Sequence, residues 1–334
     1  MSLGGCRRRS TSDTHAAANI PPPCFRVTKN IEIMSQPAST LSEASPSNRF
    51  PLAALILGGA AIGGSPIFVR LSEVGPMATA FWRVALALIP IVIVSLMKKE
   101  RGPKPQHLSD YGLLILPGVM LSLDLAAWHL SITMTSVANA TLLANLAPVF
   151  VTVIAFFFFK ARISRVFLLG LALALAGVVV LKGGPAAVGN GDLHGDGLAI
   201  TAAFFYACYI LALGSLRSRF DTMRIMLWST ASAAVCIFPV AFFIEGHMLP
   251  VTVYGWSMVF GLAFISHAGG QAAITYALAY LPPAFSSLTL LLQPVVAAIL
   301  AWALLNEAIG TMQALGGAVV LAGIMVARTS RSSA

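Results

Sequence analysis

The stretch Met77-Ala-Thr-Ala-Phe-Trp82 returns 146 residues later as Met223-Arg-Ile-Met-Leu-Trp228, with its methionine and tryptophan in the same places. The same offset holds without a gap from Leu52 to Lys182, which align with Leu198 to Arg328. Each copy carries five long apolar segments. Because five is an odd number, two such copies that cross a membrane must enter it from opposite sides, so the sequence predicts an inverted repeat.

The composition is that of a membrane protein. Hydrophobic residues make up 57% of the chain and charged residues 10%, whereas soluble domains carry about 25% charged residues. A membrane-spanning helix needs about 20 mainly apolar residues. We therefore predict an all-α polytopic membrane protein with ten transmembrane helices, at residues 51–69, 76–97, 110–132, 136–159, 165–182, 196–215, 222–244, 252–278, 284–305 and 310–327. The first five-helix repeat covers residues 50–182, the second covers 196–328, and a Gly-rich external linker at 183–195 joins them.

The formal net charge of +9 follows from the predicted topology. With the N-terminus inside the cell, 18 of the 21 lysines and arginines are cytoplasmic, Arg70 and Lys182 lie outside, and Arg83 lies within a span. This asymmetry is the positive-inside pattern. It predicts a multi-pass protein of the bacterial inner membrane with both termini in the cytoplasm. It also favours the lipid bilayer as the partner of the basic residues, and no nucleic acid.

Residues 1–49 form an N-terminal tail rich in Ser, Pro, Ala and Arg, and they lack a sustained apolar run. We expect disorder there. Two alternatives stay open, namely a misassigned translation start with Met34 as the true one, and an organellar transit segment. Residues 329–334 form a short cytoplasmic tail. Cysteine spacing matches neither a metal site nor a disulfide framework, and no catalytic motif stands in a suitable context. We expect no enzyme activity, catalytic residue, metal or cofactor.

An inverted pair of membrane repeats is the usual construction of a secondary transporter, whose site lies near the midplane between the halves. Pro148 and Pro294 interrupt the fourth and ninth spans at equivalent positions. Paired interruptions point to a transport site, and the alternative is a packing kink. Gly64 and Pro66 disfavour a straight first span, which predicts either a gate or a close-packing face. Further glycines predict close helix packing in the fifth and tenth spans: Gly170, Gly177, Gly316, Gly317 and Gly323.

Two charges lie deep within predicted spans. Arg83 and Asp124 are each roughly 10–12 Å from the outer end of their helices at 1.5 Å per residue. Charges at such depth are costly in lipid and usually face the protein interior in pairs. We expect Arg83 and Asp124 to lie at one depth and to form an ion pair. This pair is either a structural clamp or a group that responds to protons or to a substrate carboxylate.

Polar and aromatic residues recur on spans that hold equivalent places in the repeat. We expect them to converge on one central cavity, and the candidate lining residues are Trp128, His129, Asn139, Asn145, Tyr206, Tyr209, His267, Gln271 and Ser286. A cavity with aromatic walls and few fixed charges suits a small amphipathic solute. The alternative for any one of these residues is a structural role, because Ser and Thr can bond their own helix backbone and a buried histidine is often satisfied locally.

An ordered set of motifs follows the chain: Gly64-Ser65-Pro66, Pro76 to Arg83, Pro283 to Leu288, Gln293-Pro294, Asn306 to Ile309, and Gly316 to Gly323. Over about residues 50–328 this set resembles a ten-helix member of the drug/metabolite transporter superfamily with two EamA domains. The resemblance implies two inverted repeats around a cavity lined chiefly by spans 1, 3, 4, 6, 8 and 9. It implies export or exchange of small metabolites, often amino acids, and no ATP hydrolysis. It also implies an acid after the fourth span that would match Glu307, but Lys160-Ala161-Arg162 stands there.

The predicted function is a secondary transporter that exports or exchanges small metabolites by alternating access, with amino acids as the favoured substrates, as in the aromatic amino-acid exporters that the chain resembles. One alternative is a proton-coupled exporter of organic cations, which would depend on Asp124. Another is a sugar-phosphate or nucleotide-sugar antiporter, which would need more buried cations than Arg83. A non-transport membrane protein is disfavoured by the inverted repeat. The sequence leaves open whether the protein is a monomer or a homodimer, and whether transport is uniport or coupled to protons.

Overall fold

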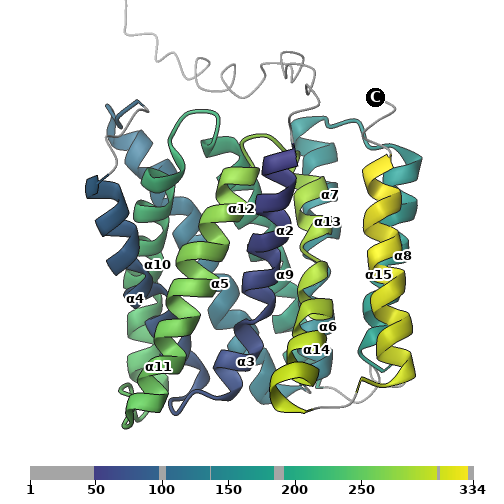
Figure 1. The fold of residues 1–334 in the computed structure, drawn as a ribbon. Coiled ribbons are helices and arrows are strands. Elements are labelled where there is room, and N and C mark those ends of the chain that lie inside the picture. Colours follow the sequence, from purple (N-terminus) through teal and green to yellow (C-terminus); the bar gives the residue numbers. More distant parts are fainter. Residues whose placement is uncertain (1–48, 98–102, 136, 184–191, 307–308, 330–334) are drawn as a thin grey trace, which may run out of the picture. The chain divides into compact units, whose positions relative to one another are not determined.

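The computed structural model describes residues 49–97, 103–135, 137–183, 192–306 and 309–329, and all regular secondary structure in these ranges is helical. The helices run side by side along one direction (Figure 1). The predictions for the N-terminal tail, for most of the linker, for Glu307 and for the last five residues lie outside the described residues.

Four of the ten predicted spans, the first, fourth, eighth and ninth, are made of more than one helical piece. The first repeat contains α2 (Arg49–Gly63), α3 (Ser65–Arg70), α4 (Pro76–Met97), α5 (Leu108–Met134), α6 (Val137–Ala144), α7 (Ala147–Phe159) and α8 (Arg165–Leu181). The second contains α9 (Leu193–Leu216), α10 (Thr222–Ile244), α11 (Val253–Gly261), the π-helix η2 (Leu262–Gln271), α12 (Ala272–Ala277), α13 (Pro283–Thr289), α14 (Leu292–Leu305) and α15 (Thr311–Thr329). These pieces follow the ten predicted segments closely.

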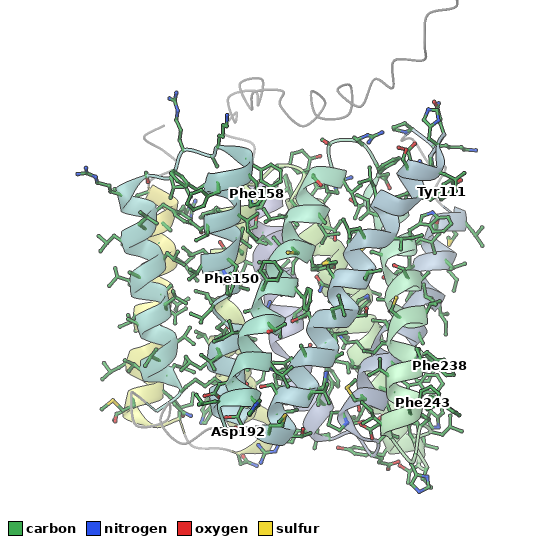
Figure 2. All side chains as sticks on the ribbon, turned by 180° about the vertical axis from the view of Figure 1, so that it is seen from behind. Tyr111, Phe150, Phe158, Asp192, Phe238 and Phe243 are labelled. Atoms are coloured by element: carbon green, nitrogen blue, oxygen red, sulfur yellow. The ribbon has the colours of Figure 1, made fainter. Side chains whose placement is uncertain are left out.

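Nine helical segments in the described residues are long and apolar enough to cross a membrane. The segment at the place of the predicted fifth span, α8, is apolar and has 17 residues. Large apolar side chains such as Phe158 and Phe243, which are 81% and 84% exposed, lie on the outside of the bundle (Figure 2). Lipid is the medium in which such a surface is stable. The all-α membrane fold is thereby confirmed, whereas the count of ten spans and the side of each terminus stay predictions.

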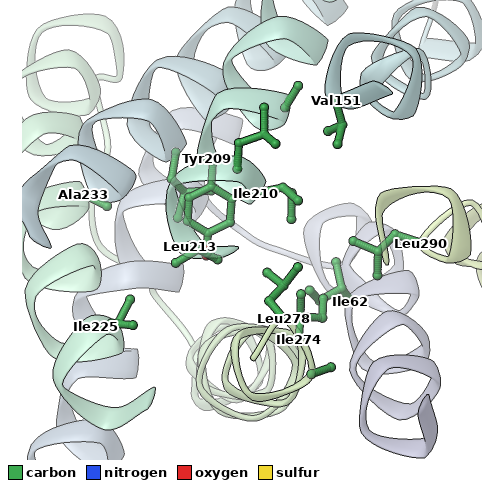
Figure 3. Close-up of a cluster of buried hydrophobic side chains, with 14 of the residues drawn as sticks. Ile62, Val151, Tyr209, Ile210, Leu213, Ile225, Ala233, Ile274, Leu278 and Leu290 are labelled. Atoms are coloured by element: carbon green, nitrogen blue, oxygen red, sulfur yellow. The ribbon is translucent and has the colours of Figure 1, made fainter. Parts of the chain in front are cut away.

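The two repeats interleave, because the main helix pairs join one repeat to the other. Helix α4 packs against α10, α5 against α9 and α10, and α8 against α15. The hydrophobic cluster in Figure 3 brings Ile62 of α2 and Val151 of α7 together with Tyr209 and Ile210 of α9 and Ile225 of α10. Residues between α4, α5 and α9 are therefore enclosed by both halves of the chain.

Glycines set the close approach of α8 and α15. A Cβ atom on Gly170 would lie 2.6 Å from the carbonyl oxygen of Gly323, and one on Gly177 would lie 2.5 Å from the backbone nitrogen of Val320. Small residues that allow backbones to touch are the usual means of helix association in membranes. This pair stands on the opposite side of the bundle from α4 (Figure 1). The predicted packing role of these glycines is confirmed.

The fourth and ninth spans break at equivalent places. Helix α6 ends at Ala144 and α7 begins at Ala147, while α13 ends at Thr289 and α14 begins at Leu292. Pro148 and Pro294 stand in the first turn of the second piece in each span. A proline is tolerated there because the first N–H groups of a helix have no partner within it. Each break thus places a half-helix N-terminus inside the span.

Loops at one end of the bundle also tie the repeats together. The Glu73 carboxylate, between α3 and α4, accepts hydrogen bonds from the backbone N–H groups of Val251 at 3.0 Å and Thr252 at 2.9 Å, and from the Thr252 hydroxyl. The reverse contact, from an acid of the second repeat to the first, is made by Glu245 after α10, which accepts a hydrogen bond from the backbone N–H of Met77 at 2.8 Å. Both carboxylates thereby satisfy N–H groups at or next to a helix N-terminus of the other repeat.

Candidate functional site

The Arg83 side chain lies at the centre of a group of polar residues from four helical elements. It interacts electrostatically with Tyr206 and Tyr209 of α9 and with Asp124 of α5. The same guanidinium acts on His129 of α5 and on His267 of η2. Because α10, η2 and α5 pack against α4 and the groups that act on Arg83 lie on other helices of the bundle, Arg83 points into the bundle and away from lipid, as a deep charge should. We call these residues, together with Gln271 and Gln293, the central polar cluster.

Arg83 and Asp124 attract one another without touching. Among the described residues, no nitrogen of Arg83 lies within 4.0 Å of a carboxylate oxygen, and the side chain of Asp124 takes part in no hydrogen bond. The expected proximity of the two charges is seen, but the expected direct ion pair is not formed. Both residues are half-buried, so each has accessible surface inside the bundle.

Several buried polar atoms of the cluster have no hydrogen-bond partner among the described residues. They are Arg83 Nε, His129 Nε2, His267 Nδ1 and Gln271 Oε1. Leaving a buried polar atom unsatisfied costs about 1–3 kcal/mol. Polar atoms buried in a purely structural core normally have hydrogen-bond partners within the protein. Four buried atoms without such a partner in one cluster therefore point to a site that is occupied by water or by a polar solute.

The two histidines are each held by one ring nitrogen. His129 Nδ1 lies 2.6 Å from the carbonyl oxygen of Leu125, one turn earlier in α5, and its ring meets Trp128 edge to face at 4.9 Å. His267 Nε2 lies 3.1 Å from the Thr230 hydroxyl of α10. In both cases the second ring nitrogen is left for another partner, so the local bond orients the ring and the free nitrogen is available to the cluster.

The eighth span carries a π-helix, which sequence periodicity did not reveal. Element η2 separates α11 from α12 and contains Ser266, His267 and Gln271, all of them at most 1% exposed. Ser266 donates a hydrogen bond to the carbonyl oxygen of Ala61 in α2 at 2.8 Å. Segments with π-type hydrogen bonding are rare and frequently mark functional sites. The adjacent Gly269 and Gly270 were the available signal, because they weaken the α-helical preference of this stretch.

Aromatic side chains complete the cluster. The Tyr206 hydroxyl lies close enough to the side chain of Gln293 to interact with it, and the rings of Tyr206 and Tyr209 lie 5.9 Å apart. Tyr206 is half-buried and Tyr209 is buried. Gln293 and Thr230 were not among the predicted site residues. Gln293 precedes Pro294 in the first turn of α14, so the half-helix break was the signal that could have identified it.

No hydrogen bond among the described residues joins the side chain of Asn145 or Ser286 to this group. Asn145 donates from Nδ2 to the carbonyl oxygen of Thr141 at 2.7 Å, at the end of α6. Ser286 in α13 is fully buried, and its hydroxyl has no partner among the described residues. The side chain of Asn139 lies outside the part of the chain that the structure describes. The cluster therefore contains five of the nine predicted lining residues, namely His129, Tyr206, Tyr209, His267 and Gln271, and Trp128 packs against it through the ring of His129.

The break in the first span lies next to a close contact between helices, and its predicted role as a gate or a packing face stays a prediction. Gly64 caps α3, and Pro66 stands in its first turn. At the preceding residue, the last of α2, a Cβ atom on Gly63 would lie 2.9 Å from the carbonyl oxygen of Gln293. Beside this break lies an apolar cavity of about 500 Å³, lined by Ala60, Ala61, Gly64, Ile67, Phe68, Leu71, Met258, Ile265, Leu300 and Leu304. None of these residues belongs to the central polar cluster, so we treat the cavity as separate from it.

A family comparison matches both halves of the chain. The model of the EamA-like transporter family matches residues 49–182 and again 193–329. The two matched ranges begin and end close to the two copies of the internal repeat. They contain every residue of the central polar cluster.

Curated relatives cover most of the chain at low identity. An uncharacterized transporter of Archaeoglobus fulgidus is 29% identical over 273 residues, which is 78% of this chain and 91% of that protein. The pseudopaline exporter CntI of Pseudomonas aeruginosa is 25% identical, covering 75% of this chain and 86% of the exporter. A probable terminal-alkyne amino-acid exporter of Streptantibioticus cattleyicolor is 26% identical over 78% of this chain and 86% of its own length.

One solved crystal structure has the same fold. It superposes with a TM-score of 0.68 over 84% of this chain and 96% of the solved chain, at 17% sequence identity. At that identity the likeness concerns the fold alone. The relatives named above are transporters or exporters, and none of their names states an enzymatic activity.

Proposed function

The chain belongs to the EamA-like transporter family of the drug/metabolite transporter superfamily, and on that premise we propose that it exports amino acids or closely related metabolites. It is a multi-pass membrane transporter of this type. The proposal concerns the substrate, the route and the direction. Its support is the central polar cluster, together with relatives whose names specify an amino-acid exporter and a pseudopaline exporter.

The single observation that carries the proposal is the mixture of groups around Arg83. One cation, one anion, two histidines and two tyrosines meet between α4, α5, α9 and η2. Unpartnered polar atoms there can orient a polar head group, while Tyr206, Tyr209 and Trp128 supply apolar surface. Small-molecule sites combine these two features. An amphipathic solute with a charged end and an apolar or aromatic side chain matches this arrangement.

We propose alternating access as the mechanism. The two repeats, residues 50–182 and 196–328, would each contribute five helices in opposite orientation, with both termini in the cytoplasm and the protein in the inner membrane. Asn145 and Gln293 stand at the breaks of spans four and nine. Half-helices that end inside a span are the usual elements that shape a transport site in inverted-repeat transporters. Rocking of the repeats around the cluster would expose it to each side in turn.

A proton-coupled exporter of organic cations is the second candidate. The observation that favours it is the Asp124 carboxylate, which forms no hydrogen bond within the described residues and is therefore available to a cation or a proton. A sugar-phosphate antiporter is less well supported, because Arg83 is the one Lys or Arg that lies far from both ends of a predicted span, whereas dianionic phosphates are usually bound by several cations.

The test is flux through the purified full-length protein in liposomes. Labelled aromatic, aliphatic and charged amino acids, an organic cation and a sugar phosphate would be compared with and without a pH gradient. Saturable amino-acid flux supports the proposal. Flux of the organic cation alone, dependent on the gradient and lost in Asp124→Asn, would replace it with the second candidate.

A further inference from the structure

We propose that Arg83 and Asp124 are the two ends of a site for a zwitterion, in which Arg83 binds the carboxylate of an α-amino acid and Asp124 binds its ammonium group. This inference rests on the proposed function. It states which atoms of the solute the protein recognises and predicts that both charges are required together.

The first observation concerns Arg83. Its guanidinium makes no hydrogen bond within the described residues, and its Nε is buried. A guanidinium carries five N–H donors in a planar fork, which matches the two oxygens of a carboxylate. An arginine with a purely structural role would donate hydrogen bonds to backbone carbonyls or to a neighbouring acid. Arg83 does neither, so its donors are available to a ligand.

The second observation concerns Asp124. It is the one acid within a predicted span that is far from both ends, and it lies near enough to Arg83 for electrostatic attraction. Nevertheless, their nitrogen and oxygen atoms are not within 4.0 Å of each other. Two opposite charges inside a membrane protein normally close into a direct pair, because each is costly to leave alone. A group that carries both complementary charges can bridge a pair that is held open in this way.

The surroundings distinguish a zwitterion from a simple anion or cation. A solute with a carboxylate alone would satisfy Arg83 and leave Asp124 uncompensated, and a simple amine would do the reverse. An α-amino acid neutralises both charges at once. The remaining polar atoms, His129 Nε2, His267 Nδ1 and Gln271 Oε1, provide acceptor and donor sites around the head group. Tyr206 and Tyr209 lie within electrostatic range of the same two charges, which places aromatic surface beside the head group.

The experiment compares three probes of one shape in proteoliposomes that contain the full-length protein. L-Phenylalanine carries both charges, phenethylamine lacks the carboxylate, and 3-phenylpropionate lacks the ammonium group. We expect saturable flux of phenylalanine and at least about 10-fold weaker transport or competition by either analogue, since losing one charge-assisted contact costs about that factor or more.

Variants assign the two ends. In Arg83→Gln, phenylalanine flux should fall about 10-fold or more, and the preference for phenylalanine over phenethylamine should disappear, because the carboxylate no longer has a partner. In Asp124→Asn, the preference over 3-phenylpropionate should disappear instead. A merely structural role would lower all three probes together. Arg165→Gln, which removes an exposed arginine from the peripheral α8, is the matched control and should leave flux unchanged.

The outcomes separate this inference from the proposed function. Wild-type protein that carries phenylalanine and phenethylamine equally well would overturn the zwitterion site while leaving amino-acid export intact. Wild-type protein that carries none of the tested amino acids would overturn both. Arg83→Lys covers the case in which Arg83→Gln fails to fold, because it keeps the positive charge. We expect it to retain the preference for phenylalanine with a weaker apparent affinity, since an ammonium cannot form the two-point contact.

Discussion

Lys160 and Asn306 end α7 and α14 in the same left-handed backbone conformation, with φ angles of 50° and 54°. They are 146 residues apart in the sequence, the same offset that relates Met77 to Met223. Their backbone N–H groups bond to the carbonyl oxygens of Ala155 and Ala301, which are also 146 apart. The repeat seen in the sequence is therefore also a repeat of backbone geometry, down to the conformation of a single residue.

This geometry predicts how the two positions respond to substitution. Asn306→Val should lower the free energy of unfolding by about 1–2 kcal/mol, because a β-branched residue is strained at positive φ, whereas Asn306→Gly should be tolerated. Thermal unfolding in detergent measures both. Arg162→Val is the control, since Arg162 is exposed in the first of the two loops and its φ is not positive. Equal losses at Asn306 and Arg162 would contradict the backbone argument.

The contact between α8 and α15 predicts a large effect from one methyl group. Gly177→Ala should destabilise the protein by about 1–3 kcal/mol, because the added Cβ would lie 2.5 Å from the backbone nitrogen of Val320 and the helices must separate. Gly112→Ala in α5 is the matched control. No atom lies within 4 Å of a Cβ built there, so this change should add up to about 1 kcal/mol by restricting the unfolded chain. Loss of stability in both variants would contradict the packing argument, because helix propensity alone favours alanine over glycine at both positions.

The loop contact of Glu73 predicts a dependence of stability on pH. Hydrogen bonds from the Thr252 hydroxyl, and then from the backbone of Thr252, hold the pKa of Glu73 below its ordinary range. A carboxylate with a lowered folded pKa adds stability above its ordinary pKa of about 4.3, and this stability is lost as the pH falls through the lower folded pKa. Melting temperatures between about pH 3 and pH 6 should therefore fall less steeply in Glu73→Gln than in the wild type.

Thr252→Val tests the cause of that pH dependence. It removes the hydroxyl that contributes most to the lowered pKa, so it should flatten the same part of the pH profile. A profile in Thr252→Val that matches the wild type would assign the effect to another acid.

The proximity of Tyr206 and Gln293 predicts coupling between spans six and nine. Tyr206→Phe and Gln293→Leu should each raise the KM for the transported solute about 5-fold if the two side chains bond to each other in the transport cycle, since a typical hydrogen bond contributes about 1 kcal/mol. The double variant should be little worse than either single one, because both remove the same contact. Full additivity in a flux assay would show that the two side chains act separately. Tyr254→Phe on α11 is a control, because that tyrosine is 52% exposed.

Much of the fold could be predicted because a segment that crosses the lipid bilayer must be apolar over its whole length, so hydropathy along the sequence marks the membrane-spanning helices. The predicted third span, residues 110–132, lies within α5 at Leu108–Met134, and the predicted seventh span, residues 222–244, has the bounds of α10. The observed helix ends differ by a few residues from the predicted ones where capping contacts determine the first or last residue of the helix. His107 and Asp110 form a reciprocal cap that lengthens α5 at its start, and hydropathy does not register such contacts.

The candidate site was less predictable. The residue types of Trp128, His129, Tyr206 and His267 identified the helices that carry polar groups. Periodicity does not specify where a side chain points once a helix is wound as a π-helix, so the placement of Gln271 had to come from the structure. The same holds for Gln293, which reaches Tyr206 only because the ninth span breaks before α14.

The sequence by itself determined the membrane class, the approximate spans, the internal repeat and the family resemblance, because each depends on local composition and on an offset that can be counted. The tertiary structure alone decided which polar residues meet, and it decided that Arg83 and Asp124 attract one another without forming a direct pair. The physical reason is that contacts between helices far apart in the sequence depend on packing, helix breaks and crossing geometry, and a linear pattern of residues records none of these.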